Sequence, residues 1–165
     1  MSIFSAVFSR SAGAWRGAEV DLADVDGIDD VADLMRDVVG AWDPAAIEGT
    51  MLLVLEADDE WFGIVRVDDH ADPRVFLSDR RVVHGYPVVG LLLETANPDV
   101  AEDAEGTGQT PYPEPVGDSE VLADLGTPGT DLLALTHREG VLPADALAAL
   151  AERAGFADSL DALRG

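Results

Sequence analysis

The chain has 165 residues, of which 47% are hydrophobic, so it has enough apolar material for a folded core and too much for a disordered chain. It carries 33 acidic residues against ten arginines and no lysine, and its formal net charge of −23 at pH 7 disfavours direct binding to nucleic acid. The absence of cysteine excludes disulfides, thiolate metal sites and cysteine nucleophiles. Because no apolar run has the length of a membrane span and the N-terminus does not read as a signal peptide, we expect a cytoplasmic protein with no membrane partner.

Two short segments at the N-terminus predict a β-hairpin. Residues 2–9 are rich in aromatic and β-branched side chains, and after a Ser-Ala-Gly break the pattern resumes over residues 14–20. An amphipathic helix is expected next, because apolar residues recur there with helical spacing behind a group of aspartates. That apolar stripe consists of Ile28, Val31, Leu34, Met35 and Val38. Gly40 and Pro44 are expected to end the helix.

Three further apolar segments, residues 51–55, 61–67 and 75–77, predict a β-meander with acidic turns. The first has no polar alternation, as expected of a strand that is covered on both faces. Residues 88–93 fit either a strand or a buried helix, because so short a run has no decisive period. The sequence therefore predicts an α+β fold, in which the N-terminal hairpin and the three-stranded meander form a mainly antiparallel sheet with one covering helix.

The composition changes at residue 95. Residues 95–118 contain four prolines, several glycines and many acids but few apolar anchors, which predicts a solvated linker. After it the pattern is helical, over residues 119–125, 130–139, 143–154 and 156–164. We therefore predict an α+β domain over residues 1–94 and a small helical C-terminal unit over residues 119–165. A unit of that size is too short to fold alone, so we expect it to pack on the first domain or on a partner.

No group of residues forms a recognisable catalytic motif. His70, His84 and His137 lack the spacing of a metal-binding or acid–base pair, which favours isolated surface histidines. Residues 22–33 resemble part of a calcium loop around Gly27, but the first carboxylate and the final glutamate of such a loop are missing. An acidic turn before the helix is the favoured interpretation. We expect no cofactor, no metal ion and no enzymatic activity.

The candidate partner contacts are aromatic and aliphatic. Trp61 and Phe62 are neighbours in one predicted strand and therefore point to opposite faces of the sheet. The pattern fits two buried side chains, or one buried side chain and one exposed anchor for a partner. The leucines of the C-terminal helices form a second apolar group. The complete set of candidate contacts is Trp61, Phe62, Leu132, Leu135, Leu147 and Leu150.

Several segments are similar to one actinobacterial family. They are residues 56–67, 72–79, 122–127, 132–135, 142–147 and 154–155. Through them the chain resembles the tRNA adenosine deaminase-associated proteins, a family named because its genes lie beside that of the deaminase. The resemblance spans most of the chain and implies an accessory role, without any functional residue to carry over. The chain is not itself a zinc deaminase, because such an enzyme holds its zinc with cysteines.

The leading hypothesis is a non-enzymatic acidic accessory or regulatory protein that binds a basic protein partner. The tRNA adenosine deaminase is the first candidate, because an enzyme that binds tRNA presents a basic surface to which an acidic protein is attracted. Two alternatives stay open: a nucleic-acid-mimicking inhibitor of another basic protein, and an enzyme with a carboxylate metal site that the sequence does not reveal. The acidity also fits a role in solubility alone.

Overall fold

The structure of the chain is a computed structural model. It describes residues 3–11, 14–22, 25–57, 60–68, 72–79, 86–96, 115–137 and 142–164. The strands are β1 (Ile3–Ser11), β2 (Ala14–Glu19), β3 (Thr50–Ala57), β4 (Trp61–Asp68), β5 (Arg74–Leu77) and β6 (Val116–Gly117). The helices are α1 (Ile28–Trp42), α2 (Pro87–Ala96), α4 (Gly129–His137), α5 (Pro143–Ala154) and α6 (Ala157–Arg164), with short 3-10 helices η1 (Pro44–Glu48) and η3 (Ala123–Leu125). None of the helices in these ranges is long and apolar enough to cross a membrane.

The six strands form one antiparallel sheet in the order β2-β1-β3-β4-β5-β6. The predicted hairpin is β1 and β2, and the predicted meander is β3, β4 and β5, so the α+β fold is confirmed. The central strands β3 and β4 are buried along nearly their whole length. Their continuous apolar sequence follows from this position, because side chains on both faces of a covered strand need apolar surroundings.

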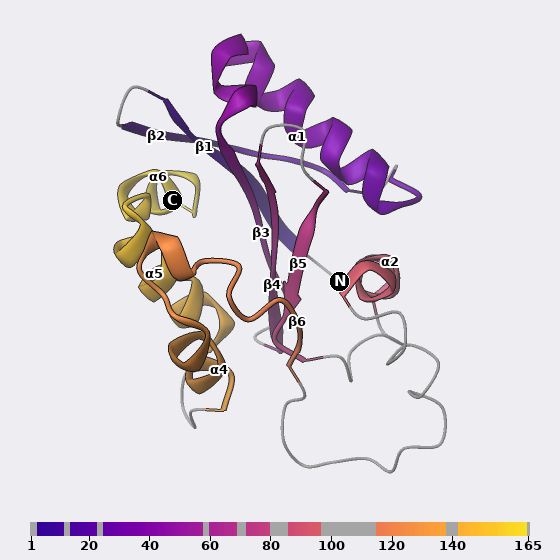
Figure 1. The fold of residues 1–165 in the computed structure, drawn as a ribbon, viewed down its shortest axis with the longest axis vertical. Helices are drawn as coiled ribbons and strands as arrows, with labels where there is room; N and C mark the ends of the chain where they lie inside the picture. Colours follow the sequence, from indigo (N-terminus) through magenta and orange to yellow (C-terminus); the bar gives the residue numbers. More distant parts are fainter. Residues whose placement is uncertain are drawn as a thin grey trace.

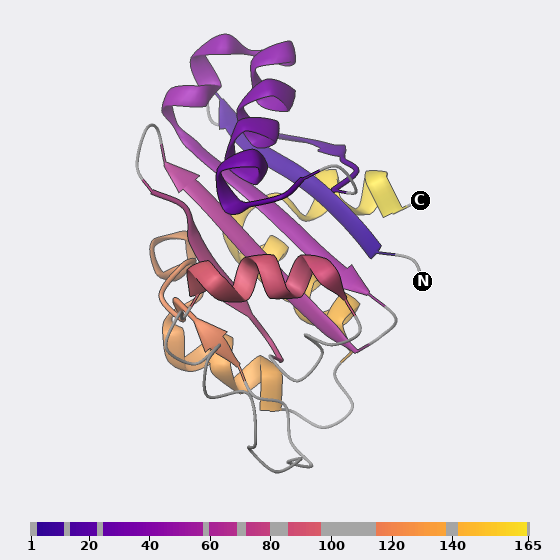
Figure 2. The same cartoon turned by 90° about the vertical axis from the view of Figure 1, so that its right-hand side faces the viewer.

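Helices cover both faces of the sheet (Figures 1 and 2). Helices α1 and α2 lie on one face, where they share a core with alternate residues of the strands, such as Leu53 and Val65. The C-terminal helices lie on the other face, where they pack on the intervening residues, such as Leu52 and Ile64. The alternation of side chains along a strand thus divides the interior into two cores.

Helix α1 begins where the sequence predicts it and continues past Gly40 to Trp42. Gly40 is not a terminator here but a point of close approach, because a Cβ at this position would lie 2.9 Å from Cδ1 of Ile47 in η1. The helix ends at Trp42, because the next residue, Asp43, is extended and its carboxylate accepts a hydrogen bond from Ala45 N at the start of η1.

The ambiguous run at residues 88–93 is helical and forms part of α2. Val89 and Leu92 are fully buried and are three residues apart, as expected for one face of a helix. Because α2 packs on the same core as α1, the sheet has two covering helices on this face rather than the one that the sequence predicts.

The C-terminal part contains one error of prediction. Helices α4, α5 and α6 form as expected, but residues 119–125 are turns followed by the short helix η3. The reason is polar pairing: Asp118 Oδ1 accepts from Glu120 N at 2.9 Å, and Val121 O accepts from Arg66 Nη1 at 2.8 Å instead of from a helical N–H. Most of the predicted linker, residues 97–114, lies outside the described residues. Its last residues include β6, which pairs with β5.

Gly126→Ala is expected to lower the free energy of unfolding by about 1–2 kcal/mol. Gly126 ends η3 with φ +106, and an added Cβ would lie 2.9 Å from the carbonyl oxygen of Arg153. Gly27→Ala is the matched control, because Gly27 is extended and a Cβ there has no neighbour within 4 Å. Denaturant unfolding measures both variants, and equal stability of the two would contradict the strain assigned to Gly126.

Candidate functional site

Trp61 and Phe62 are both buried, one on each face of the sheet. Trp61 is 0% exposed, and its ring centroid lies 5.4 Å from that of Tyr86 in the core shared with α1 and α2. Phe62 is 2% exposed and lies 6.1 Å from Phe76 in the second core. Of the two arrangements that the sequence allowed, the structure has the one with two buried side chains, so neither aromatic ring is an exposed anchor.

The candidate leucines of the C-terminal helices also face the interior. Leu132, Leu147 and Leu150 are at most 1% exposed and pack against the sheet, whereas Leu135 is half-buried. In this structure the C-terminal helices therefore use their apolar faces to cover the sheet, and of the six candidate contacts only Leu135 retains surface.

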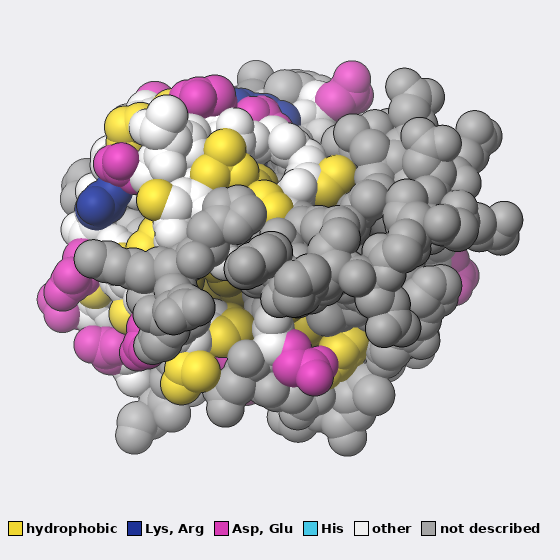
Figure 3. Space-filling view, turned by 90° about the horizontal axis from the view of Figure 1, so that it is seen from below, with side chains coloured by type: hydrophobic (Ala, Val, Ile, Leu, Met, Phe, Trp, Pro, Cys, Tyr) yellow, Lys and Arg dark blue, Asp and Glu magenta, His cyan; other side chains and the backbone are white. Residues whose placement is uncertain are grey.

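The exposed side of α1 is strongly acidic. Asp26, Asp29, Asp30, Asp33 and Asp37 are exposed and recur with helical spacing, and we call them the acidic stripe. Within this stripe Asp30 Oδ2 accepts from Asp26 N at 3.0 Å, so Asp26 and Asp30 belong to an acidic turn at the start of the helix. Residues 23 and 24 of the segment compared with a calcium loop lie outside the described residues. Seen from below (Figure 3), acidic side chains are spread over the described surface and outnumber the basic ones.

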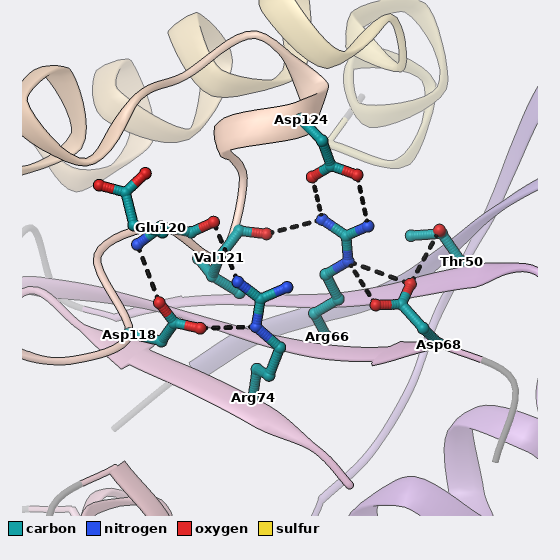
Figure 4. A network of polar contacts seen from close by, with 8 residues as sticks. All are labelled: Thr50, Arg66, Asp68, Arg74, Asp118, Glu120, Val121 and Asp124. Atoms are coloured by element: carbon teal, nitrogen blue, oxygen red, sulfur yellow. Dashed lines mark hydrogen bonds and ion pairs between the residues drawn. The ribbon is translucent and has the colours of Figure 1, made fainter. Parts of the chain in front are cut away.

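The most elaborate polar arrangement surrounds Arg66, a charged residue that is only 5% exposed (Figure 4). Its guanidinium makes a two-pronged ion pair with Asp124 of η3, with nitrogen–oxygen distances of 2.5 and 2.8 Å. Its Nε donates to both carboxylate oxygens of Asp68, and its Nη1 also donates to Val121 O. Asp68 in turn accepts from Thr50, its cross-strand neighbour on β3. Every nitrogen of this buried cation therefore has an acceptor, which burial of a charge requires.

A second arginine lies directly opposite the first. Arg74 on β5 is the cross-strand partner of Arg66 on β4, and two like charges at such positions repel each other. Arg74 Nε donates to Asp118 Oδ2 at 2.5 Å, and its Nη2 donates to Glu120 O at 3.1 Å. Each guanidinium thus binds a different carboxylate from the segment after β6. Together the two arginines hold that segment against the sheet.

The ion pair shifts the pKa of both partners. The hydrogen bond from Arg66 lowers the pKa of the Asp124 carboxyl below its usual value, and the same bond to Asp124 raises the pKa of Arg66. Both groups are therefore charged at neutral pH. These properties fit a structural clamp rather than an acid–base centre.

The sequence contains one signal of the ion pair between Arg66 and Asp124. Arg66 interrupts an otherwise apolar strand that is buried on both faces, and such an arginine needs a carboxylate from elsewhere in the chain. The identity of Asp124 as the partner could not be read from sequence, since the two residues are far apart in the chain.

In the described part of the chain, no group of three or more His, Cys, Asp or Glu side chains is arranged to hold a metal ion. His70 and His84 lie outside that part, and for His137 only the backbone is described.

Comparison with known proteins gives the family. Residues 3–157 match the family described as Rv3753c-like tRNA adenosine deaminase-associated protein. The chain is 30% identical over 116 residues to Protein Rv3753c of Mycobacterium tuberculosis (strain ATCC 25618 / H37Rv), a match that covers 70% of this chain and 64% of that protein. No solved structure is significantly similar. The match over residues 3–157 shows that the chain belongs to the Rv3753c-like tRNA adenosine deaminase-associated protein family.

Proposed function

We propose that this chain is a non-enzymatic, acidic accessory or regulatory protein that binds the tRNA adenosine deaminase through a basic surface of that enzyme. The family description supports an association with the deaminase. The observation that carries the proposal is the net charge of −23, which is complementary to the positive potential of a protein that binds tRNA. The same charge opposes binding of tRNA by this chain itself.

The attraction is expected to be long-ranged and sensitive to salt. When salt rises from about 0.05 to 0.5 M, the Debye length falls from roughly 14 to 4 Å, and we expect the complex to weaken by about tenfold or more. Calorimetry with the purified deaminase measures this change, and labelled tRNA serves as a second ligand for this chain. Absence of a complex at low salt with both proteins folded would reject the proposal, as would tight binding of free tRNA.

Two sets of substitutions separate general charge attraction from a local contact. The first neutralises Asp29, Asp33 and Asp37 of the acidic stripe, and the second neutralises Glu152, Asp158 and Asp161 on α5 and α6, all of them exposed. Both sets change the charge by the same amount. Equal weakening of deaminase binding indicates general attraction, whereas a larger loss in one set identifies the face in contact.

The two alternatives have distinct outcomes. An inhibitor that mimics nucleic acid binds basic proteins other than the deaminase with similar affinity and competes with their nucleic acid. An enzyme with a carboxylate metal site contains stoichiometric metal after purification and shows turnover. Metal analysis together with an assay of adenosine turnover in tRNA distinguishes such an enzyme from the accessory protein that we propose.

A further inference from the structure

The outer side of the edge strand β2 is open to another strand. Val20 N donates to Ser5 O at 3.0 Å, which fixes the alternation of hydrogen-bonded pairs between β2 and β1. By that alternation the backbone groups of Trp15, Gly17 and Glu19 point away from β1. No hydrogen bond joins the backbone of Gly17 or Glu19 to another described residue on that outer side.

Helix α6 lies along β2 from Trp15 to Gly17. Ser159 of α6 donates to the carbonyl oxygen of Trp15 at 3.2 Å, and the Trp15 indole donates to Ala154 O. Leu163 of α6 also lies beside Gly17, because a Cβ at this glycine would be 3.3 Å from Leu163 Cδ1. Helix α6 thus covers one sheet face at Gly17, while the outer backbone groups of Gly17 and Glu19 have no hydrogen-bond partner among the described residues. An unpaired edge of this kind presents donors and acceptors at the spacing of a peptide strand.

Two exposed arginines flank this edge on opposite faces of the sheet. The guanidinium carbon of Arg16, on β2 itself, lies 5.3 Å from the ring centroid of Trp42 in α1. That of Arg10, on β1, lies 5.6 Å from the ring centroid of Trp15. Arg10 on β1 is the cross-strand partner of Trp15 on β2, so the positive charge of Arg10 lies over the edge strand β2. The Trp42 indole donates to Ser9 at 3.1 Å, and this bond fixes the ring on which Arg16 stacks.

These two arginines differ from the others whose side chains the structure describes. Arg36, Arg66, Arg74 and Arg153 each form an ion pair with an aspartate of this chain. Arg10 and Arg16 each lie over an aromatic ring and form no ion pair with another described residue, although acids outnumber arginines 33 to ten. Their guanidinium edges are therefore available to carboxylates from outside the chain.

We propose that the open edge of β2 binds an extended peptide segment that carries two consecutive acidic residues. The backbone of the segment pairs with Gly17 and Glu19. Successive side chains of an extended segment point to opposite faces of the sheet. Because Arg16 and the Trp15–Arg10 pair occupy adjacent positions on opposite faces, consecutive carboxylates meet one guanidinium each.

The geometry favours a peptide over RNA. Arg10 lies over the Trp15 ring, which also contacts Phe156, and Arg16 lies over the Trp42 ring, so a base that stacks on the same face has to displace an arginine. The surrounding body is strongly anionic, and its repulsion acts on every phosphate of a long polyanion but on only a few charges of a short peptide. This inference does not depend on the proposed binding of the deaminase.

The test is an NMR titration of the isotope-labelled full chain with three short peptides of Thr and Val. The first peptide carries two consecutive glutamates. The second carries two glutamates separated by one residue. The third has the sequence of the first, but the backbone amides that would pair with β2 are methylated. We expect the first to shift the amides of Gly17 and Glu19 and to bind about threefold more tightly than the second, since one exposed ion pair is lost when both carboxylates share a face. The methylated peptide is expected not to bind.

Arginine variants complete the test. Arg10→Gln and Arg16→Gln each weaken binding of the first peptide by about threefold, and the double variant by about tenfold. Arg74→Gln is the matched control, because Arg74 is on β5 with three strands between it and β2. Unshifted Gly17 and Glu19 amides, equal binding of the methylated peptide, or tighter arginine-dependent binding of an oligouridylate would each overturn the proposal.

Discussion

Arg66→Ala is expected to lower the free energy of unfolding by about 3 kcal/mol. The substitution removes the bonds to Asp124, Asp68 and Val121 and leaves unfilled space between β4 and η3. Part of the usual cost of breaking a buried ion pair is avoided, because the side chain of Asp124 is 63% exposed and regains water. Urea unfolding followed by circular dichroism measures the change.

The matched control is Arg153→Ala. Arg153 bonds Asp131 at 3.0 Å, but both side chains are about half exposed, so the expected loss is under about 1 kcal/mol. Similar losses in the two variants would show that the Arg66 clamp contributes no more than a surface ion pair.

The contribution of Asp124 should depend on pH. Its pKa in the folded chain is lowered by the hydrogen bond from Arg66, so the unfolded chain binds a proton more readily than the folded one. The stability that Asp124 provides is therefore complete above its ordinary pKa of about 4 and is lost as the pH falls through the lowered pKa. In unfolding measured across this range, the difference between the native chain and Asp124→Asn is expected to shrink with acidity. A constant difference would contradict this linkage.

Phe156→Ala is expected to lower the free energy of unfolding by about 3–5 kcal/mol. Phe156 is 2% exposed between α5 and α6, and its ring stacks on Phe8 of β1 with centroids 4.6 Å apart. It also contacts Trp15 of β2 at 5.2 Å. A single side chain thus connects the C-terminal helices to the hairpin, and its truncation leaves a cavity in the core that they share.

Leu142→Ala is the control for this prediction. Because Leu142 is 47% exposed, this substitution is expected to lower the free energy of unfolding by about 0.5 kcal/mol or less. Tryptophan fluorescence and helical circular dichroism are expected to report one common transition, because the helices and the sheet share a core. Two separate transitions, or a loss below about 1 kcal/mol in Phe156→Ala, would contradict the joint core.

Local pattern was sufficient for strands β1 to β5 and for the amphipathic helix α1, whereas β6 lies in the segment predicted as a linker. The unbroken apolar run at residues 51–55 predicts a strand covered on both faces, and β3 is such a strand. The stripe from Ile28 to Val38 predicts α1, because one apolar face determines where a helix packs. The position of the last turn of α1 was not predictable, since Gly40 serves its contact with Ile47 rather than helix termination.

Long-range contacts account for what the sequence could not show. Residues 119–125 have a helical pattern, but Arg66 and Arg74 bind the carbonyl oxygens of Val121 and Glu120, and Arg66 binds the carboxylate of Asp124, which holds the segment in turns. The position of β2 at the edge of the sheet could not be predicted from the sequence either, because it depends on the order of the strands. The exposure of Phe62 depended on whether the C-terminal helices pack on the sheet, and in the structure they do. The exposure of Trp61 depended on the other face, where it is buried in the core shared with α1 and α2.

The position of β6 has a consequence for insertions. Helix α2 ends at Ala96 and β6 begins at Val116, and both elements pack beside β5, so the intervening chain leaves and returns at the same border of the sheet. For a loop whose ends are fixed close together, doubling its length costs only about 0.6 kcal/mol of closure entropy. Relatives can therefore differ widely in length between these two anchors while keeping both cores, and an affinity tag placed there should leave the fold intact.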